Sequence, residues 1–400
     1  MHRSAIPLAL LLTACFAVSA DAQTRSVSDI RSVTWYNGYT SMLESGDVDR
    51  FKQDLATMEA NGFNSVWLVV LWQDIEPVTL PEAQPDEVKL ARLDAFMDAA
   101  AERGFSVIFP LGYFGKGWAP EGIPEDLIDF WMLNDTLWDA YTGFVNRLVR
   151  RYADREDVLW LLYTENMQPG LPVGNDDDVA KESFRAYCRR LDNDIAVWNA
   201  RWKSDYASFD EIGMDDGRFK DGANRWTDHW RWIAEIMRVR FGPLAAQMKT
   251  APGWSGRVGY HDGPLITLDW AKGATPIPDE NPYDFLSLTA YMRTDSQEAS
   301  MEDNRAAYAR YRERYPEMPL MIGEVGVPTD VHDEDTQTSY LSEVVTFCAD
   351  KGMGVNIWMW RDFESTDLEQ RSFGLLNKDG SPKPALAALR AILTDTEADE

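Results

Sequence analysis

Short β-rich runs alternate with amphipathic helical stretches from residue 30 almost to the end of the chain. The helical stretches, such as Val48–Asn61, Lys89–Arg103, Leu137–Tyr152 and Asp303–Tyr315, have apolar residues three or four positions apart. This alternation predicts parallel strands joined by crossover helices. The predicted strands are Ser32–Tyr36, Ser65–Leu71, Ser106–Leu111, Val158–Tyr163, Arg257–Tyr260, Phe285–Ala290, Leu320–Gly323 and Gly354–Trp360. Eight such units favour a closed (β/α)8 barrel, although an open doubly wound sheet would give the same alternation.

The segment from about residue 178 to residue 242 is too long for one crossover helix and is rich in tryptophan. It predicts a helical insertion after the fourth strand, near the end of a barrel where loops build sites. Its indoles either form outer aromatic platforms for a ligand or belong to the core, and the same choice applies to Trp118 and Trp131. The insertion tryptophans are Trp198, Trp202, Trp226, Trp230 and Trp232.

The N-terminus has a basic start, an apolar run from Ala5 to about Val18 and small residues before Gln23, as in a secretory signal. We expect a signal peptide over residues 1–22, a single (β/α)8 domain over 23–394 and an acidic tail over 395–400. Cleavage before Cys15, with lipid attached to that cysteine, is the alternative. The protein is then secreted or periplasmic, or else a lipoprotein. No other apolar stretch approaches the roughly 20 residues that span a bilayer.

Charge and residue spacing exclude several classes of function. The formal net charge of -27 argues against nucleic acid as a partner, because phosphate backbones are bound by clustered Lys and Arg. Cys188 and Cys348 fall in predicted helices and are expected to be buried, unpaired thiols. The few histidines lack the close spacing of a zinc site, and no predicted strand ends in the lysine that a Schiff-base aldolase needs. No cofactor is expected.

Two of the predicted strands lead into a glutamate. Glu165 follows the fourth strand and Glu324 follows the seventh. Counting in steps of two, we expect Glu165 to share an inward face with Leu161 and Tyr163. Glu324 is expected to share one with Leu320 and Ile322. Either acid alone is equally well explained by a buried ion pair with an arginine. Strands four and seven of a barrel lie nearly opposite, however, so both carboxylates can reach one sugar ring. A separation of roughly 5–5.5 Å fits double displacement, and a wider one fits inversion.

The chain resembles the clan A glycoside hydrolases in three places. These are the two glutamate-ended strands, the segment Trp72-Gln73-Asp74-Ile75-Glu76-Pro77, and the C-terminal run from Phe373 to Ala385. The stretch from Asp194 to Ile212 is similar to an insertion of the family 42 β-galactosidases, although 400 residues leave no room for that family's extra domains. The resemblance implies a (β/α)8 retaining β-glycosidase that acts on a β-linked glycan.

Carried onto this sequence, the resemblance implies that Glu165 is the acid/base and Glu324 the nucleophile. Tyr291 would hydrogen-bond the nucleophile and help to keep it ionised. A sugar ring would stack on Trp358 or Trp360 of the eighth strand.

The sequence departs from the clan pattern at two positions. Thr164 stands where the clan usually has an Asn that binds the sugar 2-hydroxyl, and Asn166 follows the acid/base instead. Trp67 occupies the stretch of the second strand that often has an Arg near the nucleophile. Arg293 or Arg361 is the candidate replacement for that Arg.

Several further residues are candidate sugar contacts. Tyr36 and Asn37 end the first strand, and Trp72 follows the second. His261 is either a ligand contact after the fifth strand or a structural histidine. Asp362 and Glu364, beyond the eighth strand, are either subsite contacts or solvated loop charges.

Two functions from different classes remain open on the sequence alone. The first is an exported retaining β-glycoside hydrolase whose substrate is a β-galactoside, a β-glucan or a β-mannan. The second is a carbohydrate-binding barrel that has lost turnover, which the departures at Thr164 and Trp67 suggest. Retention of both glutamates favours the hydrolase, because a binding protein does not need two opposed acids.

Overall fold

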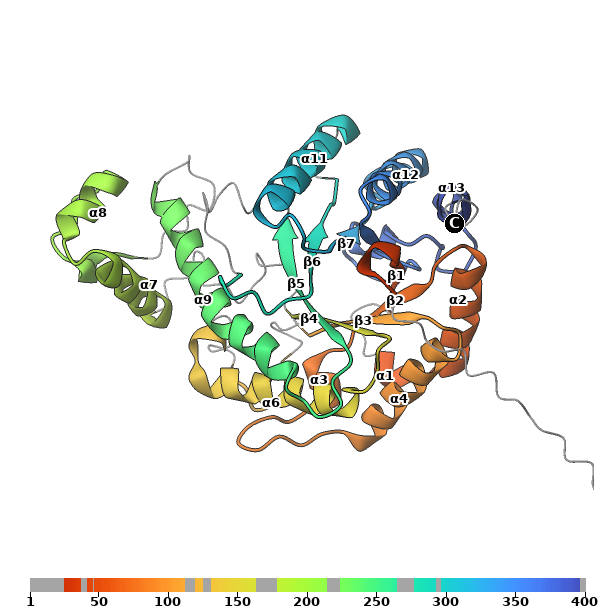
Figure 1. The fold of residues 1–400 in the computed structure, drawn as a ribbon, viewed down its shortest axis with the longest axis horizontal. Coiled ribbons are helices and arrows are strands. Elements are labelled where there is room, and N and C mark those ends of the chain that lie inside the picture. Colours follow the sequence, from red (N-terminus) through yellow and green to blue (C-terminus); the bar gives the residue numbers. More distant parts are fainter. Residues whose placement is uncertain are drawn as a thin grey trace, which may run out of the picture.

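Eight parallel strands form a closed barrel in sequence order in a computed structural model of the chain (Figure 1). The structure describes residues 25–36, 42–45, 47–111, 119–124, 131–162, 178–213, 224–264, 277–292 and 296–395. Each strand pairs with the next, and β8 closes the barrel against β1. The (β/α)8 prediction is therefore confirmed, and the open doubly wound sheet is excluded. The strands are β1 (Arg31–Trp35), β2 (Ser65–Leu68), β3 (Ser106–Pro110), β4 (Val158–Leu162), β5 (Arg257–Pro264), β6 (Phe285–Thr289), β7 (Leu320–Val325) and β8 (Gly354–Ile357).

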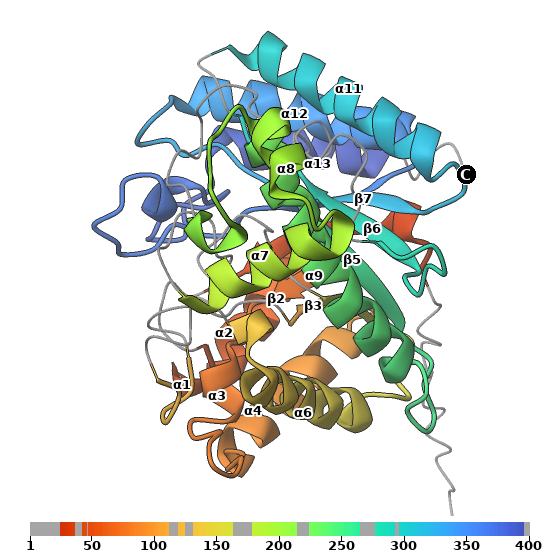
Figure 2. The ribbon, with the colours of Figure 1, turned by 90° about the vertical axis from the view of Figure 1, so that its left-hand side faces the viewer.

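Helices surround the barrel and close its outer layer (Figures 1 and 2). The α-helices are α1 (Met42–Ser45), α2 (Val48–Ala60), α3 (Trp72–Ile75), α4 (Glu87–Ala101), α6 (Asp135–Arg151), α7 (Asp178–Leu191), α8 (Ile195–Trp202), α9 (Asn224–Met248), α11 (Gln297–Arg314), α12 (Glu334–Asp350) and α13 (Pro384–Asp395), and the 3-10 turns are η1 (Val27–Asp29), η2 (Trp131–Leu133), η3 (Phe209–Glu211) and η4 (Gln370–Ser372).

Side-chain caps decide where several helices begin. The α11 helix starts at Gln297 rather than at the predicted Asp303, because the Ser296 hydroxyl accepts a hydrogen bond from the Ala299 amide at 3.2 Å. Apolar periodicity does not reveal this first turn, since it is mostly polar. In the same way, Asp333 caps α12 by accepting from the Thr336 amide at 2.7 Å.

The core has two layers separated by the strands. Along β4, Leu159 and Leu161 point into the barrel, where they pack in one cluster with Trp67. The alternate residues Trp160 and Leu162 pack outward in the larger cluster between the strands and the helices. All of them are fully buried, and burying each large apolar side chain contributes roughly 1.5–3 kcal/mol. The sequence of β4 is apolar on both faces of the strand, as expected for a strand that is buried on both sides.

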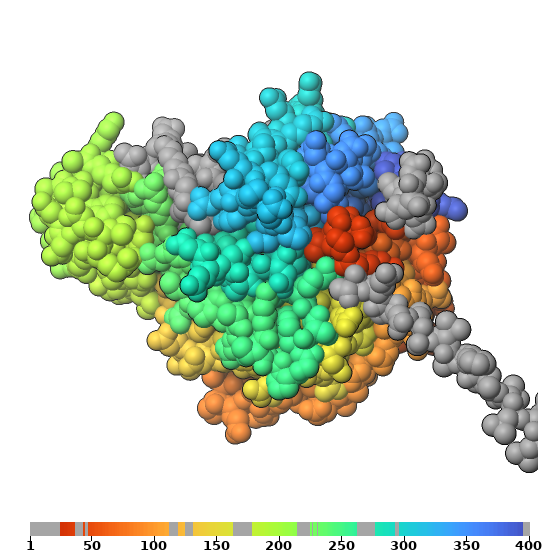
Figure 3. All heavy atoms as spheres, viewed as in Figure 1, coloured from red at the N-terminus to blue at the C-terminus, as the bar shows by residue number. Residues whose placement is uncertain are grey.

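The predicted tryptophan-rich insertion consists of α7, α8, η3 and α9, between β4 and β5. In the space-filling view its α7–α8 part forms a lobe beside the barrel (Figure 3). The Phe184 ring centroid lies 4.1 Å from that of His229 and 5.4 Å from that of Trp232. Trp202 stacks on the same phenyl ring at 5.9 Å. The insertion thus has an aromatic core of its own.

Most of the tryptophans that were candidates for outer platforms, and that the structure describes, are core residues. Trp198 and Trp232 are buried, and Trp131 is buried beside Trp138 and Tyr141. The Trp202 indole is half-buried and donates to the buried carboxylate of Asp228 at 2.9 Å. Trp118 and the side chains of Trp226 and Trp230 lie outside the described residues.

Cys188 and Cys348 are free and buried, as expected from the sequence. Burial raises the pKa of the Cys188 thiol to about 12. No helix in the described part of the chain has the length and apolar character needed to cross a membrane.

Candidate active site

Glu324 and Tyr291 meet at the end of the barrel to which the strands' carboxyl ends point. Glu324 lies near the end of β7, and Tyr291 follows the end of β6. The Tyr291 hydroxyl donates to Oε2 of Glu324 at 3.3 Å, and only 4% of Glu324 is exposed. The Ala290 amide also donates to the Glu324 carbonyl at 2.8 Å, which fixes the two segments side by side. The phenol and the carboxylate are therefore held together by both side-chain and backbone bonds.

The sequence predicts that simple alternation along β7 turns Glu324 inward, but the structure shows a different cause. Leu320 and Ile322 pack outward against the helices, whereas Met321 belongs to the interior cluster. The pairing of β7 with β8 changes register between Ile322 and Val325, and its pairing with β6 changes register opposite Glu324. An irregularity of this kind re-aims a side chain next to a site. The expectation that Glu324 continues the Leu320 and Ile322 column is therefore wrong.

The two tryptophans of the β8 segment lie on different sides of the barrel wall. Trp358 belongs to the interior cluster, and its ring centroid lies 5.6 Å from that of Tyr36. Trp360 is buried in the outer layer, with Phe63 as a ring neighbour at 6.3 Å. The peptide bond between Trp358 and Met359 is cis. Trp358, but not Trp360, is thus gathered with Tyr36 at the candidate site.

Two phenylalanines complete the aromatic surroundings of this site. Phe363 makes an edge contact with Tyr36 at 5.6 Å, and Phe373 makes one with Tyr291 at 5.7 Å. All belong to, or pack against, the cluster that contains Trp358. Neither phenylalanine is predicted as a site residue from the sequence. Their segments follow β8 without a recognisable strand or helix period, so only the tertiary structure brings them here.

His261 lies inside β5 rather than after it. The side chain is completely buried, and Nδ1 lies 2.7 Å from the Ser287 hydroxyl of β6. Its ring and the Trp67 indole form a T-shaped pair with centroids 5.7 Å apart. Burial lowers the pKa of His261 to about 3, so the ring is neutral at ordinary pH. The structure gives His261 the surroundings of a structural histidine in the barrel interior.

Trp67, on β2, is completely buried in the interior cluster. Arg361 and Arg293 are the candidate replacements for the arginine that many clan A enzymes have near the nucleophile. The Arg361 guanidinium donates to Oδ1 of Asp54 at 2.8 Å. Oδ2 of the same carboxylate accepts from the Trp35 indole at 3.0 Å. Arg361 is thus engaged with α2, outside the strands, and Arg293 lies outside the described residues.

Trp72 also packs away from the barrel interior. Its indole donates to Oε2 of Glu76 at 3.1 Å and stacks on Phe144 of α6 at 5.7 Å. Only 2% of the residue is exposed, so it joins α3 to α6 rather than lining the barrel mouth.

The loop carboxylates beyond β8 are paired with lysines. Asp362 forms an ion pair at 2.8 Å with the buried Lys383. Burial raises the pKa of Asp362, and the lysine ammonium acts in the opposite direction. Glu364 is largely exposed and pairs with Lys378 at 2.9 Å. These contacts join the loop after β8 to the C-terminal segment.

Five other predicted site residues fall in segments that the structure does not describe. They are Glu165, Thr164, Asn166, Asn37 and Arg293. β4 ends at Leu162, three positions before Glu165 along the chain. The arrangement of Glu165 relative to Glu324 therefore stays a prediction.

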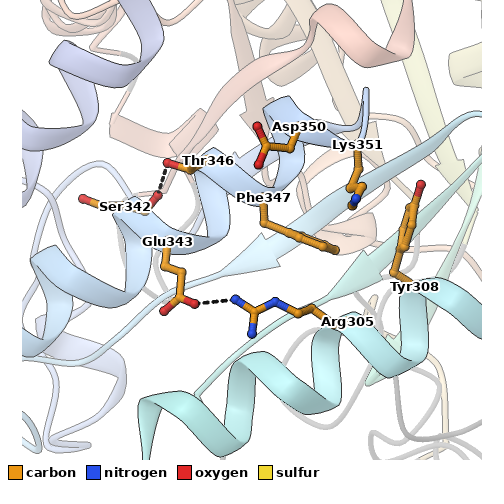
Figure 4. A pocket seen from close by; sticks show the side chains of 8 residues that line it. All are labelled: Arg305, Tyr308, Ser342, Glu343, Thr346, Phe347, Asp350 and Lys351. Atoms are coloured by element: carbon orange, nitrogen blue, oxygen red, sulfur yellow. Dashed lines mark hydrogen bonds and ion pairs between the residues drawn. The ribbon is translucent and has the colours of Figure 1, made fainter.

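A surface groove between α11 and α12 is a separate feature (Figure 4). Its volume is about 710 Å³, and Arg305 pairs with Glu343 at 2.7 Å along its wall. Asp350 and Lys351 lie at the end of α12 that leads into the start of β8. They are therefore at the opposite end of the barrel from Glu324. In the described ranges, no group of three or more His, Cys, Asp and Glu side chains is placed to hold a metal ion.

Solved structures share this architecture at low sequence identity. A β-galactosidase from Rahnella sp. R3 aligns with a TM-score of 0.69 and 13% identity over 92% of this chain and 56% of that one. The β-galactosidase of Halorubrum lacusprofundi gives 0.65 and 17%, over 92% and 58%. A GH5_18 protein from Streptomyces cattleya, solved with GlcNAc, gives 0.62 and 16%, over 93% and 81%. The chain has the barrel fold of these glycoside hydrolases.

This agreement confirms the expected resemblance at the level of the fold. The chain spans less than two thirds of the length of the two β-galactosidases. No family model matches the sequence. No curated protein matches it either.

Proposed function

We propose that this protein is a retaining β-glycoside hydrolase with Glu324 as nucleophile and Glu165 as general acid/base. The observation that carries the proposal is the hydrogen bond from the Tyr291 hydroxyl to the buried Glu324 carboxylate at the barrel mouth. Catalytic groups of (β/α)8 enzymes lie at this end of the barrel.

The reaction has two steps that share one proton donor. In the first, Glu324 attacks the anomeric carbon, the bond to the leaving oxygen breaks, and Glu165 gives that oxygen a proton. In the second, Glu165 takes a proton from water, and the water oxygen displaces Glu324 from the anomeric carbon. The sugar leaves with its original β configuration, and both acids return to their starting states.

The surroundings of Glu324 suit these steps. A phenol that donates to a carboxylate stabilises the charged, nucleophilic form, and such charge-assisted bonds are stronger than neutral ones. Trp358 and Tyr36 form an aromatic pair, and the Trp358 amide donates to the carbonyl of Val325, the residue after Glu324. The CH-rich face of a pyranose ring packs well on aromatic rings. Tyr291 and Trp358 would then orient the nucleophile and the sugar respectively.

For the substrate, we propose a β-linked oligosaccharide or polysaccharide, namely a β-galactoside, a β-glucan or a β-mannan. Proteins of similar fold include β-galactosidases and an exo-β-1,4-mannosidase. We further propose export, with residues 1–22 as the signal and the catalytic domain over 23–394. Lipid attachment at Cys15 is the alternative form of the mature protein.

A second candidate function is a carbohydrate-binding barrel without turnover. The observation that favours it is the fully buried Trp67 indole on β2, in the stretch where many clan A enzymes have an arginine near the nucleophile. Such a protein would keep the aromatic surface and bind sugar without cleaving it.

Hydrolysis of nitrophenyl β-glycosides and β-linked polysaccharides by wild type and by Glu324→Ala separates these functions. Glu324→Ala is expected to lose nearly all of the rate while still binding sugar. Azide added to Glu165→Ala is expected to restore turnover and to yield the β-glycosyl azide. Full activity in Glu324→Ala would exclude the assigned nucleophile. Binding without hydrolysis in the wild type would favour the binding protein.

A further inference from the structure

A buried polar network lies directly beneath Glu324 inside the barrel. It consists of two sets of hydrogen bonds on either side of Gly323 of β7. One joins Asn356 of β8 to Thr34 of β1 and to the Gly323 carbonyl, and the other joins His261 of β5 to Ser287 of β6. All five residues are buried. Polar groups are costly to bury unless they are hydrogen-bonded, so the bonds of this network constrain the backbone that makes them.

The Asn356 amide joins β8 to both of its neighbouring strands. Its nitrogen lies 2.7 Å from the Gly323 carbonyl and 2.9 Å from the Thr34 hydroxyl. A carbonyl oxygen only accepts, so the NH2 group must be the part of the amide that faces Gly323. The two amide protons therefore suffice for both bonds. One of the bonds ends on the residue that precedes Glu324.

Gly323 is held from its other side by close packing. A Cβ atom on Gly323 would lie 1.9 Å from the Ser287 Oγ and 2.8 Å from the His261 Nδ1. The residue is thus confined between the His261–Ser287 pair and the Asn356 amide. The register change of β7 against β8, between Ile322 and Val325, occurs at this same point. The segment that turns Glu324 inward is therefore the segment that Asn356 holds.

We infer that Asn356 is a positioning residue for the nucleophile, because its amide holds the Gly323 carbonyl and thereby sets where the Glu324 carboxylate lies relative to Tyr291. The inference rests on the proposed function of Glu324. Asn356 does not contact the reacting atoms, and its effect is exerted through one backbone carbonyl. A displacement of about 1 Å in a reacting group is enough to cost on the order of 100-fold in rate.

The test is the rate at which Glu324 is labelled by 2-deoxy-2-fluoro-β-glycosyl fluorides of galactose, glucose and mannose. In this reaction the carboxylate bonds to the anomeric carbon and fluoride leaves, so the rate reports the first step alone. Asn356→Leu removes both hydrogen bonds of the amide with little change in size. Thr34→Val removes only the bond to β1 and is the matched control. Mass spectrometry of the labelled peptide identifies the modified residue.

For Asn356→Leu we expect the maximal labelling rate to fall roughly 10- to 100-fold with the half-saturating concentration almost unchanged. Thr34→Val is expected to stay within about threefold of the wild type, because the bond to Gly323 remains. Thermal unfolding measured in parallel shows that each variant is folded at the assay temperature. If Asn356→Leu does not fold, Asn356→Ala takes its place.

The outcomes separate this inference from the function on which it rests. Equal maximal rates in Asn356→Leu and wild type would overturn the positioning role while Glu324 remained the nucleophile. Equal losses in Asn356→Leu and Thr34→Val would also overturn it, because the bond to Gly323 would then not matter. Wild type labelled by none of the three sugars, or labelled at another residue, would overturn the proposed function and the role of Asn356 with it.

Discussion

The Tyr291 hydroxyl lies 3.3 Å from Oε2 of Glu324, although the two residues come from consecutive strands and are separated by the whole of α11. The backbone bond from Ala290 to the Glu324 carbonyl fixes the two segments at the same level of the barrel. The phenol is thereby aimed at the carboxylate by the sheet itself, before any substrate is present.

Replacing Tyr291 by Phe removes the donor and keeps the ring that packs on Phe373. A hydrogen bond to a charged group is worth about 1.5–3 kcal/mol, so we expect kcat to fall roughly 10- to 100-fold. Steady-state kinetics on the best substrate of the wild type measure the effect. Tyr308→Phe, in the groove between α11 and α12, is the control, because it deletes a tyrosine hydroxyl far from the mouth. Identical kinetics in both variants would show that the Tyr291 bond has no part in turnover.

Gly323→Ala should destabilise the protein, because the new methyl group meets Ser287 and His261. Overpacking of this kind costs about 1–3 kcal/mol in the free energy of unfolding. Urea denaturation measures this free energy. In the double variant Gly323→Ala with Ser287→Gly, the nearest obstacle is gone, and we expect a loss smaller than the sum of the two single losses.

Gly143→Ala is the matched control for this pair. Gly143 lies in the middle of α6 with nothing within 4 Å of an added Cβ. Alanine is the better helix former there, so the same substitution should stabilise by about 0.5–1 kcal/mol. A Gly323→Ala variant as stable as the wild type would contradict the close packing beneath Glu324.

Trp358→Phe and Trp360→Phe should differ in which property they change. Trp358 lies in the interior cluster with Tyr36, where we propose that the sugar packs, so its replacement should raise KM or lower kcat/KM with a modest effect on stability. Trp360 is buried between strands and helices, so its replacement should cost about 0.5–3 kcal/mol of stability and leave KM unchanged. Kinetics and thermal unfolding of both variants check the pair. A higher KM for Trp360→Phe than for Trp358→Phe would reverse the assignment.

His261 should make stability depend on pH below neutrality. Its pKa is about 3 in the folded state and about 6.5 in an unfolded chain, so as pH falls below 6.5 only the unfolded state takes up this proton. The stabilisation is complete above pH 6.5 and is lost progressively as pH falls toward 3. The expected slope is at most about 1.4 kcal/mol per pH unit.

Urea unfolding of wild type and His261→Gln between pH 4 and pH 7 tests this dependence. The slopes of unfolding free energy against pH should differ between the two proteins by at most about 1.4 kcal/mol per pH unit. The variant should be less stable at pH 7 but should lose less stability on acidification. His332→Gln, in the loop before α12, controls for the loss of a partly exposed histidine outside the barrel interior. Parallel stability curves for wild type and His261→Gln would contradict a neutral, buried His261.

Periodicity predicted the eight strand–helix units, because buried strands and helices with one apolar face leave distinct patterns in a sequence. The strand count and the family resemblance, rather than periodicity, favoured a closed barrel over an open sheet. All eight predicted strands are present, with ends shifted by a few residues. Tyr291 and Glu324 were predicted as partners from the family resemblance, and the structure brings them together. Glu165 remains a prediction, since it lies outside the described residues.

Side-chain directions were harder to predict than strands. The period of two fails at Glu324, because β7 changes register against both neighbours, and no residue pattern announces that change. The period of two fails again after β8, where Trp358 turns inward and Trp360 turns outward. Trp358 contacts Tyr36 and Trp360 contacts Phe63, and no pattern in the sequence indicates either contact. Trp72 is the type of residue on which sugars stack, but in this structure its indole packs against Phe144 of α6. These outcomes depend on contacts between segments far apart in the chain.

The bond from Asn356 to Thr34 crosses the seam where the last strand meets the first. A nascent chain that has emerged only as far as β7 already contains Tyr291 and Glu324, but it contains neither Asn356 nor Trp358. The anchor of the Gly323 carbonyl and the aromatic neighbour of Tyr36 both arrive with β8. Completion of the candidate site and closure of the barrel are thus one event, and a chain that ends at β7 holds Glu324 without the amide that anchors the Gly323 carbonyl.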